Sequence, residues 1–222
     1  MIKILFVCTG NICRSPTAEA IFRRMVREAG FSDVIDSDSA STTAHHEGET
    51  PDSRAQLACR KCGLDISQHR ARQIRPEDFE EFDLILAMDW ENLTELQQRS
   101  PACYHHKIQL LMRYANDYDA AVVPDPYYGI NEGFNLVIEY CTDACNGLLE
   151  TLEKKAKQLQ RQRGLCFLAP RREKEAGTCV KIGFGFFFSS INPIPYLRGQ
   201  ELWRNIRAIQ SGFPKISRRR RS

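Results

Sequence analysis

Two chemically active residues, Cys8 and Arg14, enclose a short polar segment near the N-terminus. Cys8 follows residues 2–7, an apolar β-branched run that is typical of a strand buried on both faces. Pro16, a common first-turn helix residue, comes soon after Arg14. A tight loop between a strand and a helix turns backbone N–H groups inward, and the helix N-terminus adds its positive end. The segment is therefore predicted to bind an anion.

The residue types in this segment suit a phosphoryl group. Arg14 can hold two oxygens in a bidentate fork, which a lysine cannot do. The same positive field favours the thiolate form of Cys8, and a thiolate beneath an anion is a nucleophile directed at phosphorus. A purely apolar, buried role for Cys8 does not explain why Gly10, Asn11 and Ser15 occur in the same loop. Residues 8–15 are called the Cys8 loop below.

A candidate general acid is Asp125, which lies in a Pro-Asp-Pro-Tyr-Tyr segment. Cleavage of a phosphate ester requires a proton for the leaving oxygen. The flanking prolines restrict the backbone, and a carboxyl group beside a phosphate dianion and a thiolate keeps its proton more readily. Tyr127 and Tyr128 offer flat walls for an aromatic substrate. By itself this segment would be an ordinary turn, but beside the Cys8 loop it predicts an acid that later activates water.

Strand-like and helical patterns alternate along the chain and predict an α/β fold. Such alternation favours a parallel sheet covered by helices on both faces, a three-layer arrangement. Binding sites in these sheets lie at the carboxyl ends of the strands, where Cys8 is expected. Strands are predicted at residues 2–7, 34–39, 82–88 and 107–111, and helices at residues 16–30, 52–63, 90–99 and 132–163.

The motifs together resemble those of the low-molecular-weight protein tyrosine phosphatases. The Cys8 loop matches the pattern C-x5-R-S, and the resemblance continues through residues 67–74, 86–89 and 125–129. It covers about residues 2–160 in the right order. The resemblance implies a four-stranded parallel sheet flanked by helices. It also implies a metal-free, cofactor-free hydrolase acting on phosphotyrosine proteins or small aryl phosphates through a phosphocysteine intermediate.

The resemblance assigns roles to individual positions. Asn11 resembles the residue that supports the loop, Ser15 the hydroxyl that stabilises the thiolate, and His69 the partner of Asn11. The alternative is that His69 is an ordinary histidine at the end of a helix. Asp89 resembles a carboxylate that orients the arginine, a role compatible with capping the next helix. The full set of expected site residues is Cys8, Arg14 and Asp125 for catalysis, Thr9, Gly10, Asn11, Ile12, Cys13 and Ser15 for phosphate, and His69, Asp89, His45, Tyr127 and Tyr128 in support.

Two positions in this set bear on substrate preference and on redox behaviour. The family usually has an aromatic residue on the opposite side of the pocket, where this sequence has His45. A histidine there would weaken apolar stacking and add pH dependence. Cys13 is a second thiol close to Cys8. In the family such a residue can form a reversible disulfide that protects the nucleophile from overoxidation, and we expect the same here.

Alternative activities of the same fold remain open. Thioredoxin-coupled arsenate reductases share the C-x5-R loop, but they need a further cysteine pair, and residues 82–90 contain no cysteine. Protein-arginine phosphatases typically have threonine where this chain has Ile12, and their acid loop is less aromatic. Ile12 and the Tyr127-Tyr128 pair therefore favour phosphotyrosine over phosphoarginine.

Charge divides the 222-residue chain, whose formal net charge is +3, into two regions. Residues 1–163 contain 19 basic and 25 acidic residues, whereas residues 164–222 contain 12 basic and 3 acidic residues. We predict a phosphatase-like domain at 1–163 and an irregular basic tail at 164–222 that is poorly ordered or atypical. The alternative, from a different functional class, is that the tail binds nucleic acid or an anionic membrane surface. The sequence does not indicate an oligomeric state.

The composition of the chain excludes several classes of protein. With 42% hydrophobic residues the chain is not disordered by composition, and no apolar run approaches the roughly 18 residues of a transmembrane helix. The N-terminus lacks the features of a signal peptide, so we expect a cytoplasmic protein whose nine cysteines are mostly reduced. Cys59 and Cys62 have metal-ligand spacing without a second pair, and we interpret them as ordinary helix cysteines.

Overall fold

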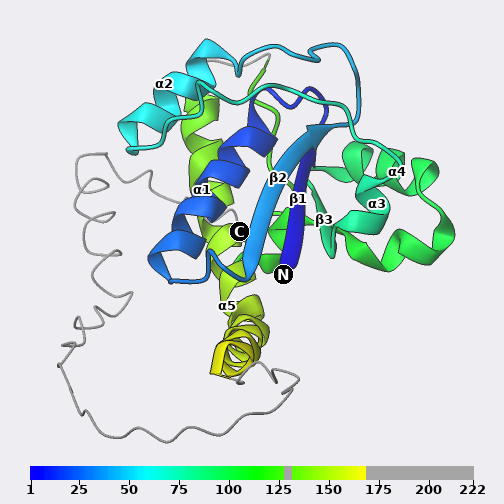
Figure 1. Ribbon diagram of the computed structural model, residues 1–222. Helices are drawn as coiled ribbons and strands as arrows, with labels where there is room; N and C mark the ends of the chain where they lie inside the picture. The colour runs from blue at the N-terminus through cyan, green and yellow to red at the C-terminus, as the bar shows by residue number, and fades with distance from the viewer. Residues whose placement is uncertain (128–131, 169–222) are drawn as a thin grey trace, which may run out of the picture. The chain divides into compact units, whose positions relative to one another are not determined.

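A computed structural model describes residues 1–127 and 132–168 (Figure 1). Its centre is a four-stranded sheet in the order β2-β1-β3-β4, and every neighbouring pair is parallel. This arrangement confirms the expected α/β fold. The strands are β1 (Ile2–Cys8), β2 (Ile35–Ser41), β3 (Leu84–Ala87) and β4 (Ile108–Leu110).

Strand β1 is buried on both faces because it lies inside the sheet with helices on each side. Ile4 and Phe6 belong to one apolar cluster, and Leu5 and Val7 belong to a second. This alternation follows from the two-residue period of a strand. The position therefore requires a nearly continuous apolar run, which only the half-buried Lys3 interrupts and which ends at Cys8 on the carboxyl edge of the sheet.

The helices form the two outer layers (Figure 1). The first cluster lies under α1, α2 and α5, and the second lies under α3, α4 and the 3₁₀ helix η1. Three layers around a parallel sheet agree with the predicted architecture. The helical elements are α1 (Arg14–Glu28), α2 (Ser53–Lys61), α3 (Asp78–Glu81), α4 (Trp90–Arg99), η1 (Ala102–Lys107), η2 (Leu111–Tyr114) and α5 (Glu132–Leu168).

Three short elements, α3, η1 and η2, were absent from the sequence prediction. They are too short to produce a helical repeat of apolar residues, so periodicity does not reveal them. Strand β3 also starts two residues later than predicted. The N–H of Phe82 donates to the carbonyl of Asp78 and closes the turn of α3, so buried Phe82 ends that helix and does not begin the strand.

Helix α5 continues to Leu168, five residues beyond the predicted end of the domain at residue 163. The predicted boundary therefore lies within a helix. Residues 169–222, which make up most of the predicted tail, lie outside the described residues. Among the helices that the structure describes, none is both long and apolar enough to cross a bilayer.

Candidate active site

Strand β1 and helix α1 position the Cys8 loop between them. Cys8 is the last residue of β1, and its side chain is buried. Its sulfur accepts a hydrogen bond from the backbone N–H of Asn11 at 3.2 Å and lies 3.1 Å from the hydroxyl oxygen of Ser15. Hydrogen-bond donors around a sulfur stabilise its anionic form. The loop is therefore suited to a thiolate at position 8.

Asn11 supports the loop through both its backbone and its side chain. Its φ of 56° lies in the left-handed region, which asparagine tolerates better than most residues. Its side-chain nitrogen donates to the hydroxyl oxygens of Ser15 at 2.9 Å and Ser39 at 3.0 Å. Its side-chain oxygen accepts from the backbone N–H of Arg72 at 3.0 Å and faces Nε2 of His69 at 3.1 Å. The expected contact between Asn11 and His69 is present.

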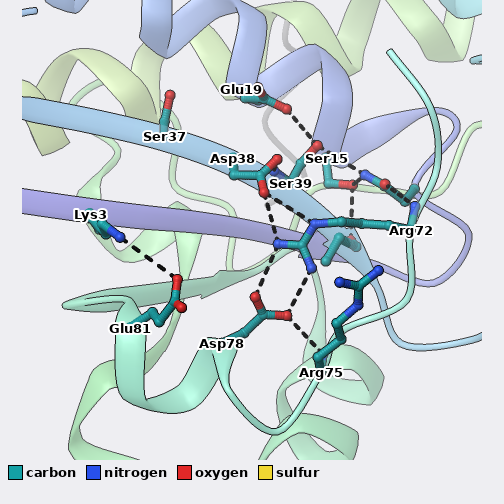
Figure 2. Close-up of polar contacts among 12 residues, drawn as sticks. Lys3, Ser15, Glu19, Ser37, Asp38, Ser39, Arg72, Arg75, Asp78 and Glu81 are labelled. Carbon is teal, nitrogen blue, oxygen red and sulfur yellow. Dashed lines mark hydrogen bonds and ion pairs between the residues drawn. The ribbon is translucent and has the colours of Figure 1, made fainter.

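Arg72, whose backbone N–H donates to Asn11, is itself fixed by two ion pairs (Figure 2). The guanidinium of Arg72 lies between the carboxylates of Asp38 on β2 and Asp78 on α3, with N–O distances of 2.8 Å to each. The backbone oxygen of Arg72 also accepts from the N–H of Ser41. Arg72 thus fixes the N–H that reaches Asn11, a role that sequence reasoning missed because Asn11 and Asp38 are distant from it along the chain.

A buried carboxylate completes the network around Asn11 (Figure 2). The hydroxyl of Ser39 donates to Glu19 at 2.6 Å, and Arg23 forms an ion pair with the other oxygen of Glu19 at 2.7 Å. Burial raises the pKa of Glu19, and the Ser39 and Arg23 contacts only partly oppose it. Burial also lowers the pKa of His69, whose Nδ1 lies 3.8 Å from Glu19. The network therefore supports the loop from its buried side.

Arg14 is the largest side chain that is fully buried, with 2% exposed, and it is the first residue of α1. Its Nη1 lies 2.5 Å from Asp89, and its Nη2 lies 2.6 Å from Asp125. Burial acts to lower the pKa of Arg14, but Cys8, Asp125 and Asp89 outweigh burial and raise it above the usual value. Arg14 therefore remains a cation next to the Cys8 sulfur.

Asp89 has two functions at once. One oxygen accepts from the backbone N–H of Asn92 and caps helix α4, while the other pairs with Arg14. The Asn92 amide lies 3.0 Å from the hydroxyl oxygen of Thr9. With its oxygen facing that hydroxyl, its nitrogen lies 3.2 Å from both oxygens of Asp89. Asn92, which sequence reasoning missed, thus joins the first turn of α4 to the Cys8 loop.

Asp125 approaches the Cys8 loop from a segment between η2 and α5. The N–H of Val123 donates to the carbonyl of Met88 at 2.8 Å, and the carbonyl of Val123 faces Nη1 of Arg14 at 3.3 Å. These contacts fix the chain two residues before Asp125. One oxygen of Asp125 contacts Arg14, and the other accepts from the N–H of Tyr127 at 3.0 Å. The three residues expected to be catalytic therefore lie together.

Comparisons with known proteins identify the family of this chain. The profile of the family described as "Low molecular weight phosphotyrosine protein phosphatase" matches residues 3–159. The mouse (Mus musculus) protein of that name is 44% identical over 150 residues, which cover 67% of this chain and 94% of the mouse protein. The chain belongs to the low molecular weight phosphotyrosine protein phosphatase family.

Solved structures extend the likeness to the fold. A protein tyrosine phosphatase from Entamoeba histolytica matches with a TM-score of 0.68 and 39% identity, covering 70% of this chain and 99% of that one. A Drosophila arginine phosphatase matches with a TM-score of 0.62 and 36% identity, covering 68% of this chain and 97% of that one. This chain is thus a phosphatase-family member whose fold also occurs in an arginine phosphatase.

Of the two adjacent histidines, His46 lies beside the Cys8 loop. His45 is exposed, and its expected place at the pocket rim stays a prediction. A Cβ added to Gly10 would lie 3.0 Å from Cδ2 of His46, and the His46 and Tyr127 rings have centroids 6.4 Å apart. A turn between Ala44 and Glu47 sets which histidine faces the loop, and sequence counting does not resolve that choice. Tyr128 lies outside the described residues.

The remaining loop residues have distinct environments. Ile12 and Cys13 are buried, whereas Thr9 is exposed and has its hydroxyl oxygen 3.4 Å from Nη2 of Arg14. Burial raises the pKa of Cys13 well above its usual range, and the nearby charges of Asp52 and Cys8 add to this effect. Cys13 is therefore a neutral thiol at physiological pH.

Helix α5 anchors the beginning of the segment that leads to Asp125. The buried carboxylate of Asp143 accepts backbone N–H groups from Asn116, Asp117 and Tyr118. One turn later, a Cβ at Gly147 would lie only 2.0 Å from the carbonyl oxygen of Tyr114, so this position requires glycine. Neither residue had a sequence signal, because both act on a segment about 30 residues away.

The two cysteines with metal-ligand spacing, Cys59 and Cys62, differ in burial. Cys59 is buried and lies 3.5 Å from the hydroxyl of Thr17, whereas Cys62 is exposed. Across residues 1–127 and 132–163, no group of three or more histidine, cysteine or acidic side chains is placed to hold a metal ion.

Proposed function

We propose that this chain hydrolyses phosphotyrosine in proteins, and small aryl phosphates, through a phosphocysteine intermediate on Cys8. The observation that carries the proposal is one set of contacts. Arg14 lies in the same loop as Cys8, and its guanidinium touches the carboxylate of Asp125. A nucleophile, a cation for phosphate and a candidate acid are thereby within reach of one phosphoryl group.

The first step transfers the phosphoryl group to the enzyme. The Cys8 thiolate attacks phosphorus in line, an S–P bond forms, and the bond from phosphorus to the phenolic oxygen breaks. Arg14 and the loop N–H groups hold the phosphoryl oxygens as charge shifts toward the leaving oxygen. The carboxyl group of Asp125 gives its proton to that oxygen, so the product leaves as a neutral phenol.

The second step returns the enzyme to its starting state. The carboxylate of Asp125 takes a proton from water while the water oxygen attacks phosphorus and the S–P bond breaks. Inorganic phosphate leaves, and sulfur recovers its negative charge. The nearby Ser15 hydroxyl and Asn11 N–H stabilise that charge and make Cys8 a better leaving group.

Substrate binding must rearrange one contact. One carboxylate oxygen of Asp125 lies 2.6 Å from Nη2 of Arg14. A phosphate dianion offers two oxygens to the guanidinium fork and can displace this single carboxylate oxygen. This displacement frees the carboxyl group of Asp125 to act as the acid, with its proton supplied by solvent.

Phosphoarginine is the second candidate substrate. The arginine phosphatase from Drosophila is 36% identical to this chain and shares its fold. Ile12 in the loop and Tyr127 beside Asp125 favour an aromatic leaving group over a guanidinium group. Because of these two residues, we favour phosphotyrosine over phosphoarginine as the substrate.

Kinetics on three substrates tests the proposal. The full chain is assayed with p-nitrophenyl phosphate, a phosphotyrosine peptide and a phosphoarginine peptide. We expect turnover of the first two, with a kcat/KM for phosphotyrosine at least about tenfold above that for phosphoarginine. A reversed preference would favour the arginine phosphatase activity, and absence of turnover on all three would contradict both.

A further inference from the structure

Arg54, at the start of helix α2, connects the Cys8 loop to the segment that carries Asp125. On one side, the backbone N–H of Asp52 donates to the carbonyl of Ile12 in the Cys8 loop at 2.9 Å. The carboxylate of Asp52 then accepts from the guanidinium of Arg54, with Nε at 3.0 Å and Nη2 at 2.8 Å. Asp52 also caps the helix by accepting the N–H of Arg54. The guanidinium is therefore tied to the Cys8 loop through a two-point fork.

On the other side, the same guanidinium contacts two aromatic rings. Its central carbon lies 5.7 Å from the ring centroid of Tyr127 and 4.8 Å from that of Phe134. Both distances are within the range of cation–π attraction. Tyr127 comes two residues after Asp125, and Phe134 belongs to the first turn of α5. Arg54 thus contacts the chain on both sides of residues 128–131.

The contact with Tyr127 reaches the acid directly. The backbone N–H of Tyr127 donates to Asp125 at 3.0 Å, and the second oxygen of Asp125 pairs with Arg14. The contacts form a closed path from Ile12 through Asp52, Arg54, Tyr127 and Asp125 back to the Cys8 loop at Arg14. Displacing Tyr127 would therefore displace the carboxyl group of Asp125.

We propose that Arg54 is a positioning residue that sets the placement of Asp125 and of the Tyr127 ring relative to the Cys8 sulfur. Arg54 does not contact the reacting atoms, so its effect on the reaction passes through Tyr127. The proposal rests on the proposed function, because it assumes that Asp125 is the general acid. The proposal predicts that substitution of Arg54 impairs proton donation by Asp125 more than it impairs phosphate binding.

Arginine suits this position better than other cations. Its planar group offers a fork to a carboxylate and a flat face to aromatic rings at the same time. A lysine has a single ammonium group, which can contact one oxygen of Asp52 or one aromatic ring. It cannot form the fork with Asp52 and contact the rings at the same time. The hydrogen bond from Arg54 also lowers the pKa of Asp52, so the fork remains charged well into the acidic range.

The test compares two aryl phosphates whose leaving groups differ in their need for a proton. Phenyl phosphate has a poor leaving group, whereas p-nitrophenyl phosphate has a good one. In the full chain, Arg54→Met should lower kcat/KM for phenyl phosphate by about fivefold to tenfold and for p-nitrophenyl phosphate by less than about twofold. Arg54→Lys should show the same bias with a smaller loss. Arg60→Ala, an exposed arginine on the same helix, is the matched control and should change neither rate.

Equal losses on the two substrates, or no loss on either, would overturn the role of Arg54 while leaving the proposed function intact. A parent chain without activity on either substrate would overturn the proposed function and the role together. If the thermal melting curve shows that Arg54→Met does not fold, the Asp52→Asn variant tests the role of Arg54 in its place. Asparagine keeps the helix cap but weakens the fork, so the same bias toward loss on phenyl phosphate is expected, and an unbiased result would overturn the proposal.

Discussion

Asp89 pairs with Arg14 at 2.5 Å through one carboxylate oxygen and caps helix α4 with the other. A single side chain thus ties Arg14 to the N-terminus of a helix on the far side of the sheet. Asn92, in the first turn of that helix, also contacts Thr9 in the Cys8 loop. The orientation of Arg14 therefore depends on where α4 begins, and it is set before any substrate binds.

The two roles of Asp89 can be separated by substitution. Asp89→Asn retains a good helix cap but removes a negative charge that faces the buried Arg14, so unfolding should become easier by about 1–3 kcal/mol. Catalysis should suffer, with kcat/KM for p-nitrophenyl phosphate falling about tenfold, because a charge-assisted contact is lost. Asp89→Ala should show the same kinetic loss and an additional cost of about 1 kcal/mol in urea unfolding. Unchanged kinetics in Asp89→Asn would contradict the orienting role.

Asp125 should compete with phosphate for Arg14. The 2.6 Å contact between them must break when phosphate binds, so removing the carboxylate charge removes a competitor. We expect Asp125→Asn to bind inorganic phosphate about threefold to tenfold more tightly than the parent, measured by titration calorimetry. The same variant should turn over phenyl phosphate far more slowly. Weaker phosphate binding in Asp125→Asn would show that the carboxylate does not oppose the ligand.

Cys13 should protect Cys8 from irreversible oxidation. Peroxide oxidises the Cys8 thiolate to a sulfenic acid, and the neutral thiol of Cys13 condenses with it, releasing water and forming a disulfide. Dithiothreitol then reduces the disulfide to the two thiols. After a fixed peroxide exposure, Cys13→Ser should recover markedly less activity on dithiothreitol treatment than the parent. Equal recovery in the two proteins would exclude this protection.

Glu19 should make stability depend on pH. Burial raises its folded-state pKa above the ordinary value of 4.5, so the folded protein binds the proton more tightly than the unfolded chain. The stabilisation that this proton gives is fully present below pH 4.5 and is lost as pH rises through the folded-state value. Glu19→Gln removes this titration, so its unfolding free energy should fall less steeply than that of the parent above pH 4.5. Parallel pH profiles from urea denaturation would contradict the assignment.

The grouping of the Cys8 loop residues was predictable because they are local in sequence. Cys8 ends strand β1, Arg14 and Ser15 begin helix α1, and only five residues separate Cys8 from Arg14. Asp125 was a candidate from its proline-flanked segment and the need for an acid, but its contact with Arg14 spans 111 residues and only the fold shows it. Arg54 and Asp143 were missed because ordinary surface helices contain such residues, and only packing reveals what they touch.

The histidine pair shows a further limit of structure prediction from the sequence. His45 and His46 have the same chemistry, and the choice between them depends on a turn of four residues. A shift of one residue turns a side chain away from its target, as it does in a strand. The family resemblance placed His45 at the pocket rim, and the backbone path brings His46 next to Gly10.

The most direct test of the central claim is to trap the intermediate. The full chain, turning over p-nitrophenyl phosphate, is quenched in acid, digested and examined by mass spectrometry. We predict one added phosphoryl group on the peptide that contains Cys8, and neither this adduct nor turnover in Cys8→Ser. An active parent with no adduct on Cys8, or a Cys8→Ser variant with normal turnover, would contradict the mechanism.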